Sequence, residues 1–333
     1  MKYISSLLAW ILLLPISTFA ENHPESNQDN FLAGKYRNPV ISQNVPDPTI
    51  IQVDDGSFYV YCTGNHVPIY RSIDLVNWVF VDSAFTNNTR PNFEPNAGIW
   101  APDINYINGK YVLYYTMSVW GGEMTCGIGV AVADRPEGPF TDRGELFRSN
   151  TIGVQNSIDQ NYVESAGKKY LFWGSWHGIH GIELTDDGLN LKEGSKPQQI
   201  AGTAYEAAYI HQRGKYYYLF ASIGSCCQGL KSTYTTVVGR SENLWGPYID
   251  KQGKPMMENN HEIVIKKNDV FVGVGHNSEI VKDKAGDDWI LYHGFSVDNS
   301  RGRRLFLDKI VWVDDWPAIA GSTPSIEADA PIF

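Results

Sequence analysis

The chain has 333 residues, of which 43% are hydrophobic and 13% aromatic, a composition typical of a folded protein of enzyme size. Its formal net charge of -10 argues against a nucleic-acid partner, because phosphate backbones attract clusters of Lys and Arg. The only such cluster consists of Arg301, Arg303 and Arg304. A neutral partner or substrate is therefore favoured.

The cysteines show neither CxxC spacing nor a metal-finger pattern, so the sequence predicts no disulfide framework. We interpret all four as small buried apolar residues. They are Cys62, Cys126, Cys226 and Cys227.

An export signal is predicted over residues 1–20, which contain a basic Lys2, an apolar run over residues 7–16 and small residues before a cleavage site after Ala20. The apolar run is too short to cross a bilayer. We expect an exported monomer, periplasmic or extracellular, with no membrane anchor after cleavage. Residues 21–34 form a polar N-terminal segment ahead of one domain over residues 35–333.

One pattern occurs five times: a turn rich in Gly or Asp followed by an aromatic run that favours a strand. The turns fall at residues 54–57, 108–110, 167–169, 213–215 and 286–288. The aromatic runs follow at residues 58–61, 111–115, 170–173, 216–220 and 289–292. Each copy predicts a β-hairpin.

The first strand of each predicted hairpin opens with a polar group. The predicted strands are residues 47–51, 103–107, 159–163, 206–210 and 276–281, and they open with Asp47, Asp103, Asp159, Glu206 and the pair His276-Asn277. A weaker repeat near residues 71–78, 131–140 and 238–248 suits outer strands. A unit of roughly 60 residues with about four strands indicates a propeller blade, so we predict an all-β, five-bladed β-propeller. The alternative is a β-sandwich with accidental similarity.

The innermost strands of a propeller run in the same direction along its channel, so the polar openers should meet at one mouth. Carboxylates brought together repel one another, and burial disfavours their charged forms, so at least one should keep its proton. Such a pair can hydrolyse a glycosidic bond with inversion. Each acid alone could instead end a strand, cap a turn or bind backbone amides, and the repeat does not say which of them act.

Several motifs are similar to those of one known family: Pro46-Asp47-Pro48, Trp100-Ala101-Pro102-Asp103, Asn156-Ser157-Ile158-Asp159, Tyr205-Glu206-Ala207, Gly275-His276-Asn277-Ser278 and the segment over residues 226–234. Through them the chain resembles glycoside hydrolase family 43, most closely its endo-1,5-α-L-arabinanases. The resemblance extends from about Tyr36 to Pro317. It agrees with a five-bladed propeller.

The resemblance implies a role for each acid. Asp47 would be the general base, Glu206 the general acid, and Asp159 the group that keeps the acid protonated and oriented. Asp103 would be mainly structural.

The resemblance also implies a calcium ion in the channel, with His276 as its protein ligand and water at most other positions. The residue alone would otherwise be interpreted as a hydrogen-bonded channel histidine. Trp100 and Trp120 would stack on sugar, although core packing explains either residue equally well. Asn156 and Ser175 would bind sugar hydroxyls.

These implications predict an inverting hydrolase that cuts α-1,5-linked L-arabinan of plant cell walls internally. An exo-acting α-L-arabinofuranosidase or β-xylosidase of the same family is the first alternative, favoured by the stretch Val45-Pro46-Asp47-Pro48. The loops at residues 121–124 and 299–302 are where such an enzyme would block its cleft. The second alternative is a sugar-binding propeller without activity.

Overall fold

A computed structural model describes residues 34–333, so the predicted signal peptide at 1–20 and nearly all of the polar segment at 21–34 lie outside the described residues. The described chain is almost entirely β. Its helical parts are α1 (Ser149–Ile152) and the 3-10 turns η2 (Gly229–Lys231), η3 (Met256–Glu258) and η4 (Ala320–Ser322). No helix in this range is long and apolar enough to cross a membrane. The all-β prediction is confirmed.

Three sheets have four strands each, and in each sheet the strands pair in chain order. The first sheet contains β2 (Thr49–Gln52), β3 (Phe58–Tyr61), β4 (Pro68–Ser72) and β5 (Val79–Ser83). The second contains β6 (Gly98–Ile107), β7 (Lys110–Ser118), β8 (Gly127–Ala133) and β9 (Thr141–Arg148). The third contains β10 (Asn161–Ser165), β11 (Lys168–Trp173), β12 (Ile179–Glu183) and β13 (Gln198–Ala201).

The remaining large sheet has nine strands in two groups. The first group is β14 (Glu206–Arg213), β15 (Tyr216–Ile223), β16 (Thr235–Ser241) and β17 (Glu262–Ile265). The second group is β18 (Phe271–Gly275), β19 (Val281–Lys282), β20 (Asp288–Ser296), β21 (Asn299–Val313) and β22 (Trp316–Ala318). The two groups are joined through one parallel pairing, of Thr235 with Val274. A two-stranded sheet pairs β1 (Lys35–Arg37) with β23 (Glu327–Asp329).

The predicted hairpin turns all lie between paired antiparallel strands. The predicted first strand at residues 276–281 is wrong for most of its length, because β18 ends at Gly275 and β19 begins only at Val281. His276 has a left-handed backbone with φ 50°, which interrupts an extended strand. The Asn277 side chain then bonds the Ser278 carbonyl locally in place of a regular ladder.

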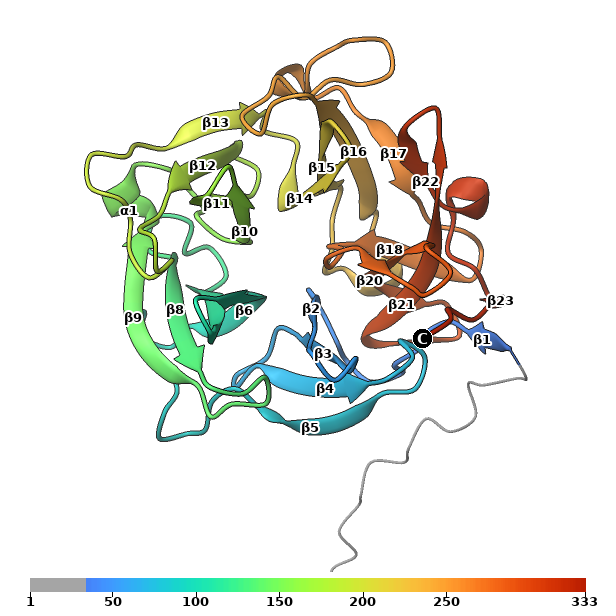
Figure 1. Ribbon diagram of the computed structural model, residues 1–333, viewed down its shortest axis with the longest axis horizontal. Helices are drawn as coiled ribbons and strands as arrows, with labels where there is room; N and C mark the ends of the chain where they lie inside the picture. Colours follow the sequence, from blue (N-terminus) through green and yellow to red (C-terminus); the bar gives the residue numbers. More distant parts are fainter. Residues whose placement is uncertain (1–33) are drawn as a thin grey trace, which may run out of the picture.

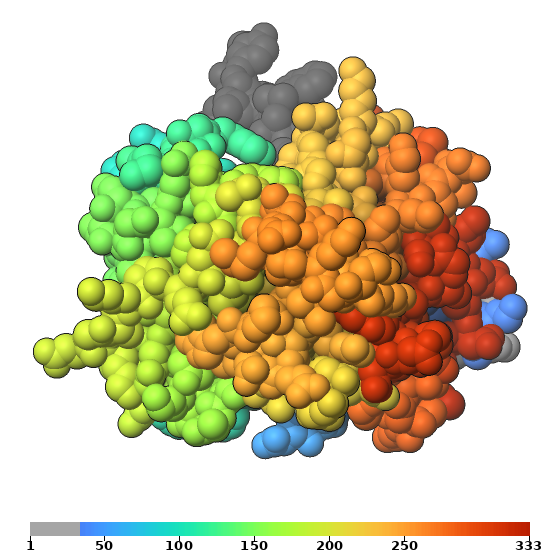
Figure 2. Space-filling model, turned by 90° about the horizontal axis from the view of Figure 1, so that it is seen from above, coloured from blue at the N-terminus to red at the C-terminus, as the bar shows by residue number. Residues whose placement is uncertain are grey.

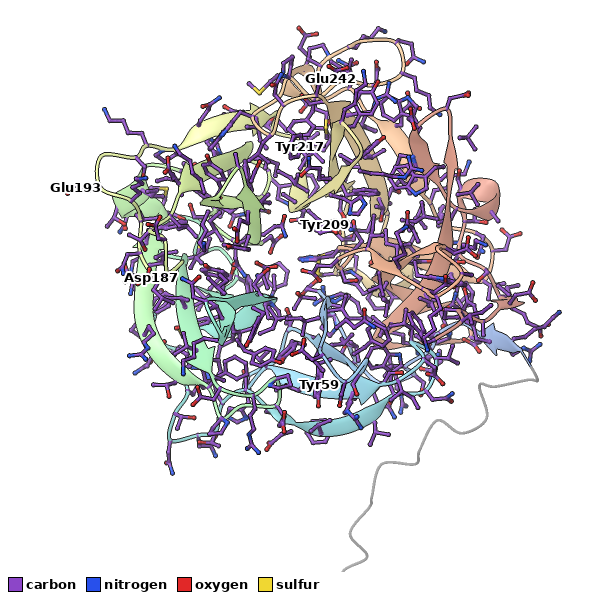
Figure 3. All side chains as sticks on the ribbon, in the orientation of Figure 1. Tyr59, Asp187, Glu193, Tyr209, Tyr217 and Glu242 are labelled. Carbon is purple, nitrogen blue, oxygen red and sulfur yellow. A yellow bond between two sulfur atoms is a disulfide. The ribbon has the colours of Figure 1, made fainter. Side chains whose placement is uncertain are left out.

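The sheets stand around a common axis, with β2, β6, β10, β14 and β18 nearest the axis and β5, β9 and β13 at the outer edge (Figure 1). Figure 2 shows from the side that segments consecutive in the chain lie next to one another. In Figure 3, Tyr209 of β14 lies toward the axis, whereas Asp187, Glu193 and Glu242 lie at the periphery. The start of each first strand therefore lies near the centre.

Five clusters of buried apolar side chains fill the spaces between neighbouring sheets or strand groups. One of them packs Phe58 and Val60 of the first sheet against Leu291 and Leu305 of β20 and β21. The beginning and the end of the chain thus share one apolar core, and burial of this apolar surface stabilises the contact between them.

Candidate active site

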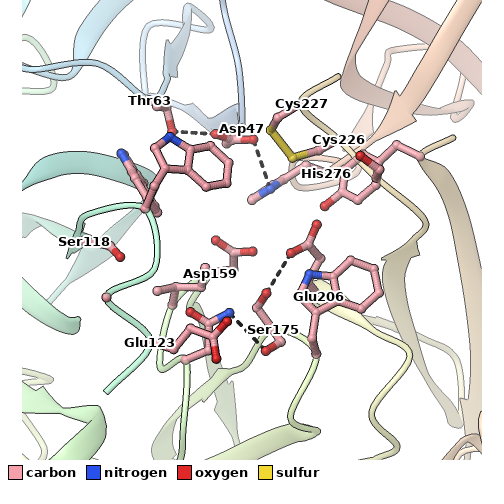
Figure 4. Close-up of a pocket in the computed structure, with 18 of the residues that line it drawn as sticks. Asp47, Thr63, Ser118, Glu123, Asp159, Ser175, Glu206, Cys226, Cys227 and His276 are labelled. Carbon is pink, nitrogen blue, oxygen red and sulfur yellow. Dashed lines mark hydrogen bonds and ion pairs between the residues drawn. A yellow bond between two sulfur atoms is a disulfide. The ribbon is translucent and has the colours of Figure 1, made fainter. Parts of the chain in front are cut away.

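A cavity of about 670 Å³ opens at the end of the sheets where the first strands begin. All of the predicted site residues line it: Asp47, Trp100, Trp120, Asn156, Asp159, Ser175, Glu206 and His276. Figure 4 shows Asp47, Asp159, Glu206 and His276 directed toward a common space. The sequence repeat therefore brings together side chains that are far apart in the chain.

The backbone turns sharply at the start of each first strand. One residue with a left-handed backbone occurs at or within two positions of each predicted polar opener: Asp47 (φ 53°), Ala101 (φ 40°), Asp159 (φ 61°), Ala207 (φ 56°) and His276 (φ 50°). This region is unfavourable for residues with a Cβ and is often found at functional sites. A residue with a left-handed backbone thus recurs near the predicted polar opener of every repeat.

A second set of polar residues, which the sequence analysis did not identify, supports these turns. They follow the aromatic run of each hairpin: Thr63, Thr116, Ser175, Ser222 and His293. The amide of Asp159 donates to Thr116 Oγ1 at 3.2 Å, and the amide of His276 donates to Ser222 Oγ at 2.9 Å. Each member thereby connects one repeat to the next. Their regular position after the aromatic runs was a signal that the sequence carried.

Asp47 is held as a carboxylate by three partners. Its Oδ1 accepts a hydrogen bond from Arg303 at 2.7 Å, its Oδ2 accepts one from Thr63 at 2.6 Å, and His276 Nδ1 lies 3.3 Å from Oδ1. Burial disfavours the charge, but the Arg303 guanidinium and His276 outweigh it and hold the pKa of Asp47 well below its usual range. Asp47 is therefore ionised at neutral pH.

His293 lies behind Asp47 and is fully buried. Its Nδ1 accepts the Asp47 amide hydrogen at 3.0 Å, so the 3.2 Å approach of the same nitrogen to Asp47 Oδ1 is not an ion pair. Burial, together with the nearby Arg303, lowers the pKa of His293 to about 4. His293 is consequently neutral and positions the backbone of Asp47.

The pKa values of Asp159 and Glu206 are shifted in the opposite direction from that of Asp47. Burial raises the pKa of Asp159 to about 7; His276 opposes this shift, whereas Glu206 and Asp47 add to it. Burial also raises the pKa of Glu206, although hydrogen bonds from Ser175 and Tyr234 oppose the shift. Ser175 Oγ donates to Glu206 Oε2 at 2.7 Å. The cavity therefore combines one ionised carboxylate with carboxyl groups that retain protons more readily.

Asp103 does not line this cavity. Its Oδ2 accepts hydrogen bonds from the Tyr162 amide at 2.8 Å and from Asn105 at 2.9 Å. A side-chain hydrogen bond joins it to Glu279, whose own carboxylate accepts from Thr49 and from the Ile50 amide. Asp103 thus belongs to a separate buried carboxyl pair.

The predicted sugar-binding residues lie on the cavity wall in different surroundings. Trp120 is 81% exposed, and its ring centroid lies 5.5 Å from that of Trp100. Core packing does not explain the position of Trp120. Asn156 donates to the Ser175 carbonyl at 3.2 Å, and the Ser175 hydroxyl is engaged by Glu206. These two polar side chains therefore support the loops and the acid as well as lining the cavity.

One prediction about the cysteines was wrong. Cys62 and Cys126 are buried free thiols, as expected, but Cys226 and Cys227 form a disulfide between adjacent residues and line the cavity. A disulfide framework is usually inferred from cysteines spaced along the chain, and that pattern gives no indication of a bond between neighbours.

Arg303 and Tyr234 are further cavity residues. The sequence did not indicate that Arg303 contacts Asp47 or that Tyr234 contacts Glu206.

Glycoside hydrolases use two carboxyl groups in one cavity. The ionised group activates water, and the protonated group gives its proton to the leaving oxygen. The family model described as "Glycosyl hydrolases family 43" matches residues 36–317. The chain belongs to this family.

Two relatives and one solved structure show how similar the chain is to known members. It is 33% identical over 308 residues to the extracellular exo-α-(1→5)-L-arabinofuranosidase ArbA of Cellvibrio japonicus, covering 83% of this chain and 86% of that protein. It is 33% identical over 290 residues to the extracellular endo-α-(1→5)-L-arabinanase 1 of Bacillus subtilis, with coverage of 82% and 86%. The α-L-arabinanase of Cellvibrio cellulosa complexed with arabinohexaose matches with a TM-score of 0.75 at 31% identity, covering 84% of this chain and 96% of that one.

Proposed function

We propose that this protein is an inverting endo-arabinanase that hydrolyses α-1,5-linked L-arabinan internally. The observation that carries the proposal is the pairing, in one cavity, of the ionised Asp47 with the more readily protonated Glu206. Family membership and the names of both the endo-acting and the arabinohexaose-bound relatives support the substrate.

In this proposal Asp47 is the general base and removes a proton from water as the water attacks the anomeric carbon. Glu206 is the general acid and gives its proton to the departing sugar oxygen, so water attacks one face while the leaving group departs from the other. Asp159 would keep Glu206 protonated, because a charge on either carboxyl group disfavours ionisation of the other, and the charge of Glu206 is among the causes that raise the pKa of Asp159. The Tyr234 and Ser175 hydroxyls orient Glu206.

The fold that fits this site is a five-bladed propeller, with the nine-stranded sheet counted as two blades. Support comes from the single pairing between its two strand groups and from the apolar cluster that packs the first sheet against β20 and β21. We also propose that the protein is exported, in keeping with the extracellular relatives.

Variants of the two proposed catalytic carboxyl groups test the function. Asp47→Asn and Glu206→Gln should each lower kcat on linear arabinan by about 1,000-fold, because general acid–base groups contribute about 10²–10⁴-fold. Circular dichroism and thermal unfolding would show whether the fold is kept. Wild-type rates in either variant would remove that residue from the mechanism.

The product profile separates the endo-acting enzyme from its alternatives. On debranched arabinan an internal cut releases a ladder of oligosaccharides early in the reaction, and we expect this outcome. Release of arabinose alone would establish an exo-acting enzyme like the Cellvibrio relative. Binding without any product would establish the sugar-binding alternative.

We further propose that His276 binds a calcium ion, with water as most of the other ligands. The contact of Nδ1 with Asp47 leaves Nε2, for which the described residues provide no partner, available to a metal. No group of three or more His, Cys, Asp or Glu side chains in residues 34–333 is arranged to hold a metal, so water must supply the oxygen ligands that calcium prefers. The ion would supply positive charge beside the carboxyl groups.

Chelation tests the calcium proposal. Dialysis against EDTA should lower the melting temperature by several degrees and reduce activity, and added calcium should restore both, because an ion that binds only the folded state stabilises it. Metal analysis of the undialysed protein provides a readout that does not depend on activity. A melting temperature that EDTA leaves unchanged, in protein that contains no calcium, would overturn the proposal.

A further inference from the structure

A closed ring of hydrogen bonds joins the predicted first strands of neighbouring repeats. In each of these segments one side chain accepts the backbone amide hydrogen of the corresponding segment in the next repeat. The bonds run from Ile104 N to Thr49 Oγ1 at 3.1 Å, from Tyr162 N to Asp103 Oδ2 at 2.8 Å, from Ile210 N to Asn161 Oδ1 at 2.9 Å, from Ile280 N to the Tyr209 hydroxyl at 2.9 Å and from Ile50 N to Glu279 Oε2 at 2.6 Å. The last bond returns to the first segment and closes the ring. We call the five acceptor side chains the strand ring.

The members of the strand ring have regular positions in the chain. The first four lie two residues after the residue with a left-handed backbone that begins each segment, and all four are buried. Glu279 lies three residues after His276, so the last segment contains one extra residue before its ring member. Hydrogen bonds behind a site lock the geometry of the groups in front of them. The strand ring therefore holds the residues that line the cavity at fixed positions relative to one another.

Glu279 makes the connection between the two ends of the chain. Its Oε1 accepts a hydrogen bond from Thr49 Oγ1 at 2.9 Å, in addition to the bond from the Ile50 amide to Oε2. Thr49 and Ile50 follow Asp47 by two and three residues, and Glu279 follows His276 by three. Asp47 Oδ1 and His276 Nδ1 lie 3.3 Å apart (Figure 4). Glu279 therefore joins two segments whose starts carry side chains in contact with each other.

Glu279 accepts these bonds as a carboxylate. Burial raises the pKa of both Glu279 and Asp103, but the hydrogen bond between them raises the pKa of Asp103 and opposes the rise for Glu279. Asp103 thus holds the shared proton and donates it. Hydrogen bonds to a charged acceptor are shorter and stronger than those between neutral groups. In agreement, the bond from the Ile50 amide is the shortest of the strand ring.

We propose that Glu279 is a positioning residue that keeps the proposed base, Asp47, in contact with its cationic and imidazole partners. Those partners, Arg303 and His276, belong to the same end of the chain as Glu279. Glu279 does not line the cavity that contains Asp47 but a separate one of about 290 Å³, so it acts through the segment and not on the substrate. The inference rests on the proposed role of Asp47 and adds to it the residue that holds the base in place.

Kinetics of two Glu279 variants test the inference. Glu279→Leu removes the acceptor, and kcat on linear arabinan should fall about 100-fold with KM changed by less than about threefold, because a misplacement of about 1 Å affects the chemical step by that much. Glu279→Gln keeps an oxygen that can accept the Ile50 amide hydrogen. It should retain at least about one third of the wild-type kcat.

The pH profile distinguishes positioning of the base from a general loosening of the fold. The low-pH limb of kcat/KM reports the ionisation of the base, and in Glu279→Leu it should move up by at least about one pH unit. The reason is that burial alone raises the pKa of Asp47, and its partners no longer oppose this. The titratable groups that face Asp47 are the same in both proteins: Arg303, His276, His293, Cys62, Asp159 and Glu206.

Asn161→Leu is the matched control. It removes one acceptor of the same strand ring, but the bond it breaks joins β10 to β14, and neither segment carries Asp47 or His276. The low-pH limb should stay at its wild-type position. An equal shift of this limb in Asn161→Leu and Glu279→Leu would overturn the specific role of Glu279.

A readout without substrate separates this inference from the proposed function. Carbon NMR of protein labelled at its Asp carboxyl groups, with the Asp47 signal identified by its loss in Asp47→Asn, should show a higher pKa of Asp47 in Glu279→Leu than in the wild type. An unchanged pKa and an unchanged kcat in the folded variant would overturn the inference and leave hydrolysis intact. A wild-type protein that does not cut arabinan would overturn the proposed function, whereas the NMR shift would still be expected.

A second variant serves if Glu279→Leu does not fold. Thr49→Val keeps the shape of the side chain and removes the hydroxyl that donates to Glu279. It should raise the pKa of Asp47 in the same direction by a smaller amount, and no change in that pKa would overturn the inference.

Discussion

The sequence repeat pairs Asp103 with Asp159, yet Asp103 lies within β6 and Asp159 just before β10, and their surroundings differ. Asp159 lines the cavity beside Glu206, and its pKa is raised to about 7. Asp103 lies outside the cavity, where Tyr162, Asn105 and Glu279 occupy its carboxyl group. In the structure the left-handed residue of the second repeat is Ala101, two positions before Asp103. Asp103 is therefore offset from the cavity position that Asp159 holds, and its carboxyl group binds buried partners instead.

Exchange of each acid for its amide tests this difference most strongly. Asp159→Asn should lower kcat on linear arabinan by about 100-fold, because it removes the carboxyl group whose partial ionisation near neutral pH favours the protonated form of Glu206. Asp103→Asn should change kcat by less than about threefold, since its carboxyl group does not reach the cavity. Steady-state kinetics of the two variants, with thermal unfolding as the check on folding, would measure the contrast.

Equal losses of kcat in the two variants would contradict the distinction between them. An inactive Asp103→Asn protein with an unchanged melting temperature would place the buried pair in the mechanism as well.

A smaller predicted effect is the change of the unfolding free energy with pH that Asp103 causes. Burial, and next the charge of Glu279, hold the pKa of Asp103 well above its usual value in the folded protein. The folded state therefore keeps a proton that the unfolded state releases near pH 4, so the stabilising contribution of the pair is complete below that pH and is lost as pH rises through the folded pKa. The phenols of Tyr114 and Tyr209 that face the pair stay neutral, because burial raises their pKa.

Asp103→Asn removes this ionisation. Relative to wild type, the variant should gain at least about 1.4 kcal/mol of unfolding free energy between pH 5 and pH 8, the equivalent of one pKa unit. Urea unfolding of both proteins at the two pH values gives the difference, in which the titration of all other groups largely cancels. A difference that does not change with pH would show that the pair carries no shared proton.

Much of the site was predictable because it follows from the repeat. The repeated order of turn and aromatic run predicted where the hairpins form. The polar residue at the start of each predicted first strand indicated that Asp47, Asp159 and Glu206 meet in one cavity. Local features were not predictable. The break at His276 depends on a left-handed backbone angle, and the partners of Asp47 come from β20 and β21, about 250 residues away in the chain.

The disulfide escaped prediction for a different reason. Its cysteines are adjacent, so no loop length or spacing rule predicts a bond between them.

The contacts around Asp47 have a consequence for biosynthesis. Asp47 directly precedes the first sheet to leave the ribosome, but Arg303, His293 and His276, which set its charge and orientation, emerge much later. A nascent chain that has completed β14 would already contain all three proposed catalytic acids, with the proposed base still unsupported. If Asp47 is the base as proposed, the chain gains its full site only when translation is nearly complete, and a product truncated before residue 303 is expected to be inactive.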